Sequence, residues 1–238
     1  MAAEDFTHDR YRELLRVALG EGYGFHPFTD VGAVDGRGIF LRHDVDFDPC
    51  WIVPMSAIER EEGVLATYCV QPDSINYEAD SDELRTAVAA LLADGHRLGL
   101  HLDATVIADD AEVAHRAEEE ADRMAERFGA QVDVVSWHMQ GRRGAGHVEL
   151  RDGLVNAYAP QFFTKIGYVS DSNQHWRGKD LEAILRAGEH RLLQVLVHPM
   201  WWRPQRRTLL ECMTELATKR GVAIDDLLTP EQRELIEA

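Results

Sequence analysis

The chain has 238 residues, 45% of them hydrophobic, which is long enough to bury a sizeable core as one large α/β domain. The 42 acidic and 25 basic residues give a formal net charge of −17, which disfavours nucleic acid and anionic membrane surfaces as partners. The amino-terminal residues show no basic lead before an apolar run, and no segment is suited to span a bilayer, so we expect a cytoplasmic protein.

Helical and strand patterns alternate along the chain, starting with apolar residues at helical spacing near the amino terminus. The predicted helices cover residues 6–19, 52–62, 80–94, 111–128 and 181–187, and the predicted strands cover 38–42, 65–70, 98–102, 132–137, 167–170 and 192–197. Repeated βα units predict a parallel sheet, either open or closed into a barrel. We expect a single domain over residues 1–238, with 221–238 as a polar carboxy-terminal tail.

The stretch LRHDVDFDP (41–49) places two carboxylates beside an apolar strand. Strand periodicity puts Asp44 and Asp46 on one face and His43 on the other. Buried carboxylates need a partner, so we expect one to bind a metal while the other acts as a base. The simpler alternative is that both aspartates cap the next helix, which begins near Pro49.

Polar side chains recur where the other predicted strands end. The residues at these ends are His101, Asp103, Ser136, His138, Asp171 and His198. The carboxyl ends of parallel strands meet at one edge of a sheet, which is where sites form in such folds. Imidazole beside carboxylate suits zinc, iron, cobalt or manganese better than magnesium or calcium.

Aromatic residues accompany the last of these histidines. His198 precedes Trp201 and Trp202, so it is either a general acid with a tuned pKa or part of an aromatic cluster. Together with Trp176, these tryptophans form either a platform for a sugar ring or ordinary core. Phosphate-binding glycine loops, dinucleotide fingerprints and Gly-x-Ser-x-Gly elbows are missing from the sequence.

Six segments occur in the order of a known family: RHDVDFDP, GVLATYCV, GHRLGLHLDA, VVSWH, YVSDSNQHWR and LVHPMWW. As a set they resemble the polysaccharide deacetylase superfamily, the chitooligosaccharide-deacetylase-like carbohydrate esterases. The first segment resembles the branch that carries RHDVD in place of TFDDG, and the resemblance covers residues 6–202. It implies an irregular (β/α) barrel of about seven parallel strands.

The resemblance also implies roles for single residues. Asp44 matches the catalytic base and His198 the general acid, while Asp46 and His101 match metal ligands of the family. A divalent metal is therefore expected as cofactor, with zinc favoured and iron, cobalt or nickel as alternatives.

The family's third ligand, a second histidine, would fall at Thr105 in this chain. We expect His138 to complete the metal set in its place, with Asp103 in reserve. His138 stands where the family has an arginine, and Arg177 is expected to help replace that arginine. The residues expected to bind or orient the substrate are Asp103, Asp171, Trp176, Arg177 and Trp201.

The expected function is metal-dependent removal of an N-acyl group, in the first place N-acetyl, from a sugar or sugar-containing metabolite. The partner is then a small-molecule or oligosaccharide N-acetylated substrate, and no feature indicates an oligomeric state. The alternative is a catalytically silent barrel that binds carbohydrate or metal. Thr105 favours that alternative, whereas retention of Asp44 and His198 opposes it. A metal-dependent phosphoesterase would need more ligands, for two metals.

Overall fold

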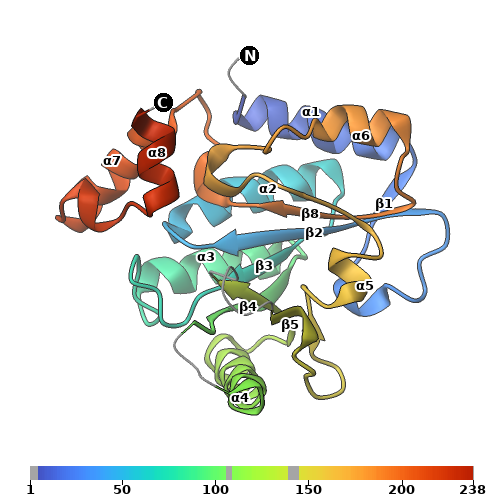
Figure 1. The fold of residues 1–238 in the computed structure, drawn as a ribbon, viewed down its shortest axis with the longest axis horizontal. Coiled ribbons are helices and arrows are strands. Elements are labelled where there is room, and N and C mark those ends of the chain that lie inside the picture. The colour runs from blue at the N-terminus through green and yellow to red at the C-terminus, as the bar shows by residue number, and fades with distance from the viewer. Residues whose placement is uncertain (1–4, 106–108, 139–144, 238) are drawn as a thin grey trace.

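The computed structural model describes residues 5–105, 109–138 and 145–237, which form helices around a parallel sheet (Figure 1). The strands are β1 (Tyr23–Phe25), β2 (Arg37–Val45), β3 (Thr67–Val70), β4 (Arg97–Asp103), β5 (Val132–His138), β6 (Val155–Asn156), β7 (Gly167–Ser170) and β8 (Leu192–Val197). Seven strands follow the order β6-β5-β4-β3-β2-β8-β7, and β1 pairs beside the start of β2. The predicted α/β fold of about seven parallel strands is confirmed, as a half-barrel whose described end strands, β6 and β7, are not paired with each other.

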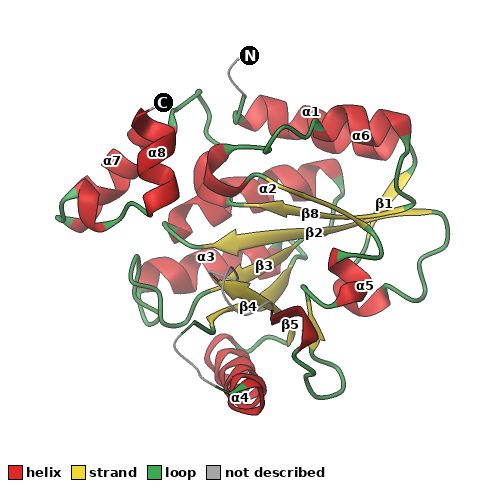
Figure 2. Cartoon of the chain, viewed as in Figure 1, coloured by secondary structure: helices red, strands yellow, loops and turns green. Residues whose placement is uncertain are grey.

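The helices lie around this sheet, and the last two lie together at one side of it (Figure 2). They are α1 (His8–Gly20), α2 (Ile52–Glu62), α3 (Asp82–Ala93), α4 (Asp110–Phe128), α5 (Pro160–Phe163), α6 (Leu181–Ala187), α7 (Leu209–Arg220) and α8 (Pro230–Glu237). Neighbouring helices contact one another in the series α6, α1, α2, α3, α4. The predicted tail after residue 221 contains α8, which packs against α7. Among the described helices, none combines the length and apolar character needed to cross a membrane.

Capping residues set the helix ends. Thr7 begins α1 by accepting a hydrogen bond from the backbone N–H of Arg10, and Thr208 forms a capping box with Glu211 at the start of α7. Gly63 ends α2 with φ of 70°, a left-handed conformation that costs glycine little. The bounds of α2 therefore coincide with the predicted range.

Inside the half-barrel, an apolar cluster fills the end away from the strand carboxyl termini. Its buried residues are Phe28, Val34, Phe40, Cys69, Val134, Ala157, Phe162 and Leu192. The rings of Phe28, Phe40 and Phe162 lie 5.0 to 5.6 Å apart between centroids. Because this end is closed by packed hydrocarbon, the inward polar side chains of β2, β4 and β5 gather at the opposite end.

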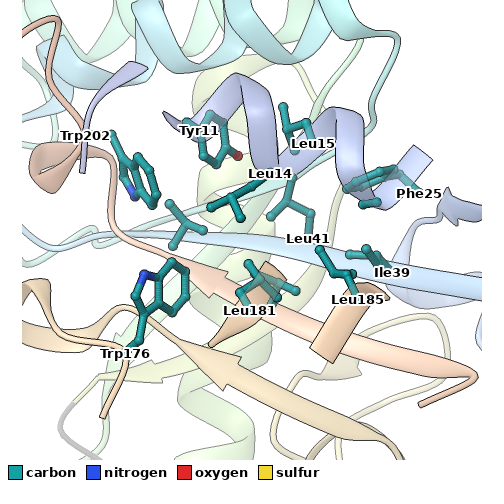
Figure 3. A pocket seen from close by; sticks show the side chains of 13 residues that line it. Tyr11, Leu14, Leu15, Phe25, Ile39, Leu41, Trp176, Leu181, Leu185 and Trp202 are labelled. Atoms are coloured by element: carbon teal, nitrogen blue, oxygen red, sulfur yellow. The ribbon is translucent and has the colours of Figure 1, made fainter. Parts of the chain in front are cut away.

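The outer face of β2 and β8 packs against α1 and α6 around a small apolar cavity of about 20 Å³ (Figure 3). Leu14 and Leu15 of α1, Leu181 and Leu185 of α6, and Trp176 are among its walls. A space of this size with hydrocarbon walls offers a water molecule no hydrogen-bond partners, so it is a packing gap and not a ligand site.

A buried polar cluster ties α1 and α2 to the same outer face. The carboxylate of Glu59, on α2, accepts hydrogen bonds from the hydroxyls of Tyr11 and Tyr68 and contacts Nε2 of His43. His43 also stacks on Tyr68, with ring centroids 4.1 Å apart. His43 thus faces away from Asp44, as strand periodicity predicted, and serves helix packing.

Candidate functional site

The carboxyl ends of four strands bring the candidate residues together. Asp44 and Asp46 lie at the end of β2, His101 is on β4, His138 ends β5, and His198 follows β8. In these elements the side chains that point inward alternate with those that point outward. The half-barrel therefore collects the polar inward side chains in one place.

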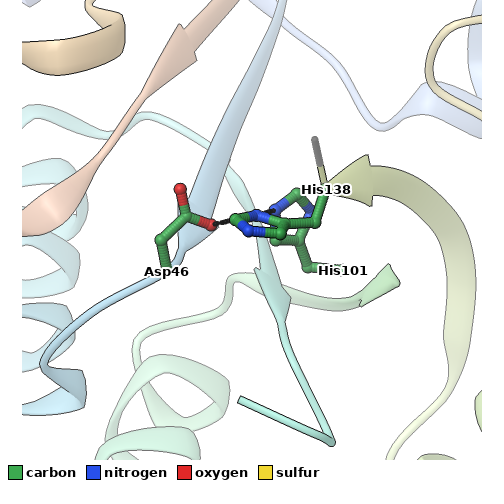
Figure 4. A group of neighbouring side chains, drawn as sticks. All are labelled: Asp46, His101 and His138. Carbon is green, nitrogen blue, oxygen red and sulfur yellow. Dashed lines mark hydrogen bonds and ion pairs between the residues drawn. The ribbon is translucent and has the colours of Figure 1, made fainter. Parts of the chain in front are cut away.

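Asp46, His101 and His138 form a tight group (Figure 4). Oδ1 of Asp46 lies 2.9 Å from Nε2 of His101 and 3.4 Å from Nδ1 of His138. The two imidazole nitrogens are 3.1 Å apart. One atom from each residue thus faces a common point, with His101 buried and the other two partly exposed.

This group offers the donors of a metal site. Oδ1 of Asp46 is buried and makes no hydrogen bond of good geometry with any described residue, which is unusual for a carboxylate oxygen. Burial raises the pKa of Asp46, but attraction to His101 and His198 holds it well below its ordinary value. Contact with Asp46 likewise outweighs burial and raises the pKa of His138. Positive charge is therefore stabilised at this point, and one carboxylate with two imidazoles fits a divalent transition metal.

His198 stands beside this group and is held by Asp171. Its Nδ1 lies 2.6 Å from Oδ1 of Asp171, and its backbone N–H donates to the same carboxylate. Trp202 Nε1 donates to the other oxygen of Asp171 at 2.8 Å. Nε2 of His198 is left 3.5 Å from Oδ2 of Asp46. Burial lowers the pKa of His198, but attraction to and hydrogen bonding with Asp171, with further attraction to Asp46 and Asp44, raise it to about 9.

Asp44 is buried and anchored by Arg42, a residue that the sequence analysis missed. Arg42 Nε lies 3.1 Å from Oδ1 of Asp44, and Nη2 donates to Oδ2 at 3.2 Å. The guanidinium also donates to Gln194 and to the hydroxyl of Tyr158, each at 2.9 Å. Arg42 precedes Asp44 by two positions, so strand periodicity alone could have placed both side chains on the same face.

The alternative that the aspartates cap a helix does not match the structure. Asp48, and neither Asp44 nor Asp46, precedes the 3-10 turn at Pro49–Trp51 and accepts a hydrogen bond from the backbone N–H of Cys50. The two earlier carboxylates are thus available for the site.

Two other predicted residues have partners outside the Asp46 group. Asp103 accepts hydrogen bonds from the backbone N–H and hydroxyl of Thr105, at 2.8 and 2.6 Å, and is not part of the Asp46 group. Arg177 is exposed and pairs with Glu231 of α8 at 2.8 Å, while Arg42 supplies the guanidinium beside Asp44.

The two predicted tryptophans differ from each other. Trp176 is buried, packs against Phe6 and Trp202, and lines the outer cavity. Trp201 is buried with its ring 5.0 Å from Phe47 and 6.4 Å from His198 between centroids. Its Nε1 has no hydrogen-bond partner among the described residues. Trp201 therefore lies beside the site, whereas Trp176 belongs to the packing under α1.

A second group of metal-ligand type, Asp48, Cys50 and Glu83, is already held by an ammonium group. Nζ of Lys219 lies 2.9 and 3.0 Å from the oxygens of Asp48 and 2.6 Å from Glu83. Burial, with a hydrogen bond to Asp48, raises the pKa of Cys50 to about 12, so its thiol stays protonated at neutral pH. This group is an ion-pair cluster that fastens α7 to the main body.

No protein-family model matches the chain, and no curated protein matches it. Solved structures that match include carbohydrate esterases and deacetylases. A Streptococcus mutans CE4 esterase is 14% identical over 86% of this chain and 92% of its own, with a TM-score of 0.48. The Streptococcus pyogenes deacetylase PplD, in complex with acetate, is 12% identical over 80% of this chain and 81% of its own, with a TM-score of 0.45.

A CE4 family pseudoenzyme from Bacillus anthracis also matches, at 14% identity over 78% of this chain and 63% of its own, with a TM-score of 0.43. The matches thus include a deacetylase, an esterase and a pseudoenzyme.

Proposed function

We propose that the chain is a metal-dependent hydrolase that removes an N-acyl group, in the first place N-acetyl, from a sugar or a sugar-containing metabolite. The observation that carries the proposal is the meeting of Asp46, His101 and His138, with both imidazoles facing one buried carboxylate oxygen, beside the His198–Asp171 pair. Asp46, His101 and His138 would hold the metal, with zinc favoured. When bound, the metal supplies Lewis-acid activation of the acyl carbonyl and of water.

Asp44 is proposed as the general base that accepts the proton of the attacking water. Arg42 holds its carboxylate in one orientation through contacts to both oxygens. Oδ1 of Asp44 makes no other hydrogen bond with the described residues and keeps acceptor capacity. Asp44 therefore has both a fixed position and a free lone pair.

His198 is proposed as the general acid. With a pKa raised to about 9, it is protonated at neutral pH, and Asp171 fixes Nδ1 so that Nε2 is the atom directed toward the metal group. Transfer of the Nε2 proton to the departing amine nitrogen allows the C–N bond to break, because a free amide anion is a very poor leaving group.

The substrate proposal rests on the sequence resemblance and on charge. A chain with a net charge of −17 disfavours polyanionic substrates, so a neutral N-acetylated sugar or oligosaccharide is favoured. A cytoplasmic location stays a prediction. The silent barrel stays the alternative, and its signature is metal binding without hydrolysis.

Acetate release from N-acetylglucosamine oligomers by zinc-loaded protein tests this function. We expect release by the wild type, none by Asp46→Asn, which loses a metal ligand, and very slow release by His198→Gln, which keeps the metal. The matched control is Asp103→Asn, whose side chain belongs to a turn with Thr105. Zinc binding without release from any N-acetyl sugar would favour the silent barrel.

A further inference from the structure

Ser136 lies between the proposed base and a proposed metal ligand. Its hydroxyl, fully buried on β5, donates a hydrogen bond to Oδ2 of Asp44 at 3.1 Å. The hydroxyl oxygen of Ser136 lies 3.1 Å from Nδ1 of His101. Nδ1 of His101 is 3.8 Å from Asp44, so the hydroxyl is the closer of the two groups to it.

A count of protons fixes the direction of these bonds. A serine hydroxyl carries one proton, and a carboxylate can only accept, so the contact with Asp44 uses that proton. Toward His101 the hydroxyl oxygen can then only accept, which requires the proton of the neutral imidazole to be on Nδ1. The lone pair of His101 is consequently on Nε2, the atom that faces Asp46 at 2.9 Å.

A β-bulge makes this arrangement possible. Leu98 pairs with Val132, but Leu100 pairs with Val135, so β5 contains one extra residue between the two pairs. Beyond the bulge, His101 lies opposite Ser136. Without it, His101 would lie opposite Val135, whose side chain points to the other face.

We propose that Ser136 is a positioning residue that holds His101 in the Nδ1–H tautomer, with Nε2 free to bind the metal, and links this ligand to Asp44. Groups that orient a metal-binding histidine in this way commonly change metal affinity when they are removed. The inference rests on the proposed metal site. Ser136 is not one of the three proposed metal ligands and acts through His101.

The first test needs no substitution. In zinc-loaded wild type, long-range ¹H–¹⁵N NMR of the His101 ring, assigned by its absence in His101→Asn, should show the proton on Nδ1. A proton on Nε2, with Nδ1 bound to zinc, would overturn the inference.

The second test compares zinc affinities by competition with a chromogenic chelator. Ser136→Ala should weaken zinc binding by about 10- to 100-fold. Ser56→Ala is the matched control, because Ser56 is equally buried on α2 and lies away from the site, with its hydroxyl 2.9 Å from Oδ2 of Asp94 and 3.1 Å from the carbonyl oxygen of Val53. The zinc affinity of this variant should equal that of the wild type.

The outcomes separate this inference from the proposed function. Equal zinc affinity in Ser136→Ala and the wild type would overturn the role of Ser136 and leave the metal site standing. Failure of the wild type to bind zinc would overturn the proposed function and this inference with it. Thermal unfolding of both serine variants checks that each is folded at the temperature of the measurement.

Discussion

Replacing Asp171 by asparagine keeps the shape of the side chain and removes the charge that holds His198. In metal-free protein, the pKa of His198 is raised from 6.5 to about 9. A difference of that size corresponds to ~3 kcal/mol of stability at 1.36 kcal/mol per pH unit. Asp171 is the largest contributor that raises this pKa, with Asp46 and Asp44 behind it, so ~3 kcal/mol is an upper bound for its part.

The pH dependence of this stabilisation follows from the linkage between proton binding and folding. A histidine whose folded-state pKa is raised stabilises the fold fully below its unfolded pKa of 6.5, and that stabilisation is lost as the pH rises through about 9. Asp171→Asn should therefore lower the free energy of unfolding most near pH 6, by up to ~3 kcal/mol more than near pH 9.5. A further loss that does not depend on pH is expected, because the amide of asparagine cannot accept all the hydrogen bonds that Asp171 accepts.

The assay is urea unfolding in a chelator at several pH values between these limits. His198→Gln is the companion variant, because it should remove the same pH-dependent part. If Asp171→Asn lowers the free energy of unfolding by the same amount at both ends of the pH range, the reasoning about His198 is refuted.

Three further predictions concern other parts of the molecule. Asp44→Asn should retain zinc and lose about 10²- to 10⁴-fold in the rate of acetate release, and full activity in this variant would rule out Asp44 as the base. Leu185→Ala, which enlarges the apolar cavity under α6, should cost ~2–5 kcal/mol in urea unfolding, whereas a near-zero loss would mean that the helix collapses onto the gap. Glu59→Gln should cost ~1–3 kcal/mol because the amide cannot accept all the buried hydrogen bonds that Glu59 accepts from Tyr11 and Tyr68, and unchanged stability would contradict the role of this cluster.

The sequence predicted the parts of the fold that have strong local signals. The bounds of α2, α6, β7 and β8 coincide with the predicted ranges, because apolar periodicity and glycine stops act within each segment. The strands β1 and β6 were missed, since two or three residues carry no periodicity, and α5 and α7 were missed as well. The predicted strand at 38–42 is longer in the structure, so Asp44 lies within β2 and not after it.

The site was predicted in part for a similar reason. The ends of the predicted strands indicated four site residues: Asp46, His101, His138 and His198. In the structure each of the three histidines lies within a few ångströms of Asp46. Asp103 shares a face with His101 by periodicity, yet its carboxylate is used by the turn at Thr105, a choice that the pattern alone does not show.

The partners of Asp44 depend on contacts between strands. The position of Ser136 beside His101 depends on a one-residue bulge in β5 where it pairs with β4. No local sequence pattern indicates this bulge. Arg42 lies two positions before Asp44 and on the same face of β2, where it donates to the carboxylate. It was missed because only the residues at the strand ends were considered.

The central claim is that Asp46, His101 and His138 together hold one metal ion. Plasma mass spectrometry on protein that has been chelated and then returned to zinc tests it most directly, with His138→Ala and Asp103→Ala beside the wild type. We expect a single zinc per chain in the wild type and in Asp103→Ala, and its loss in His138→Ala. A wild type without metal, or a metal lost from Asp103→Ala and kept by His138→Ala, would contradict it.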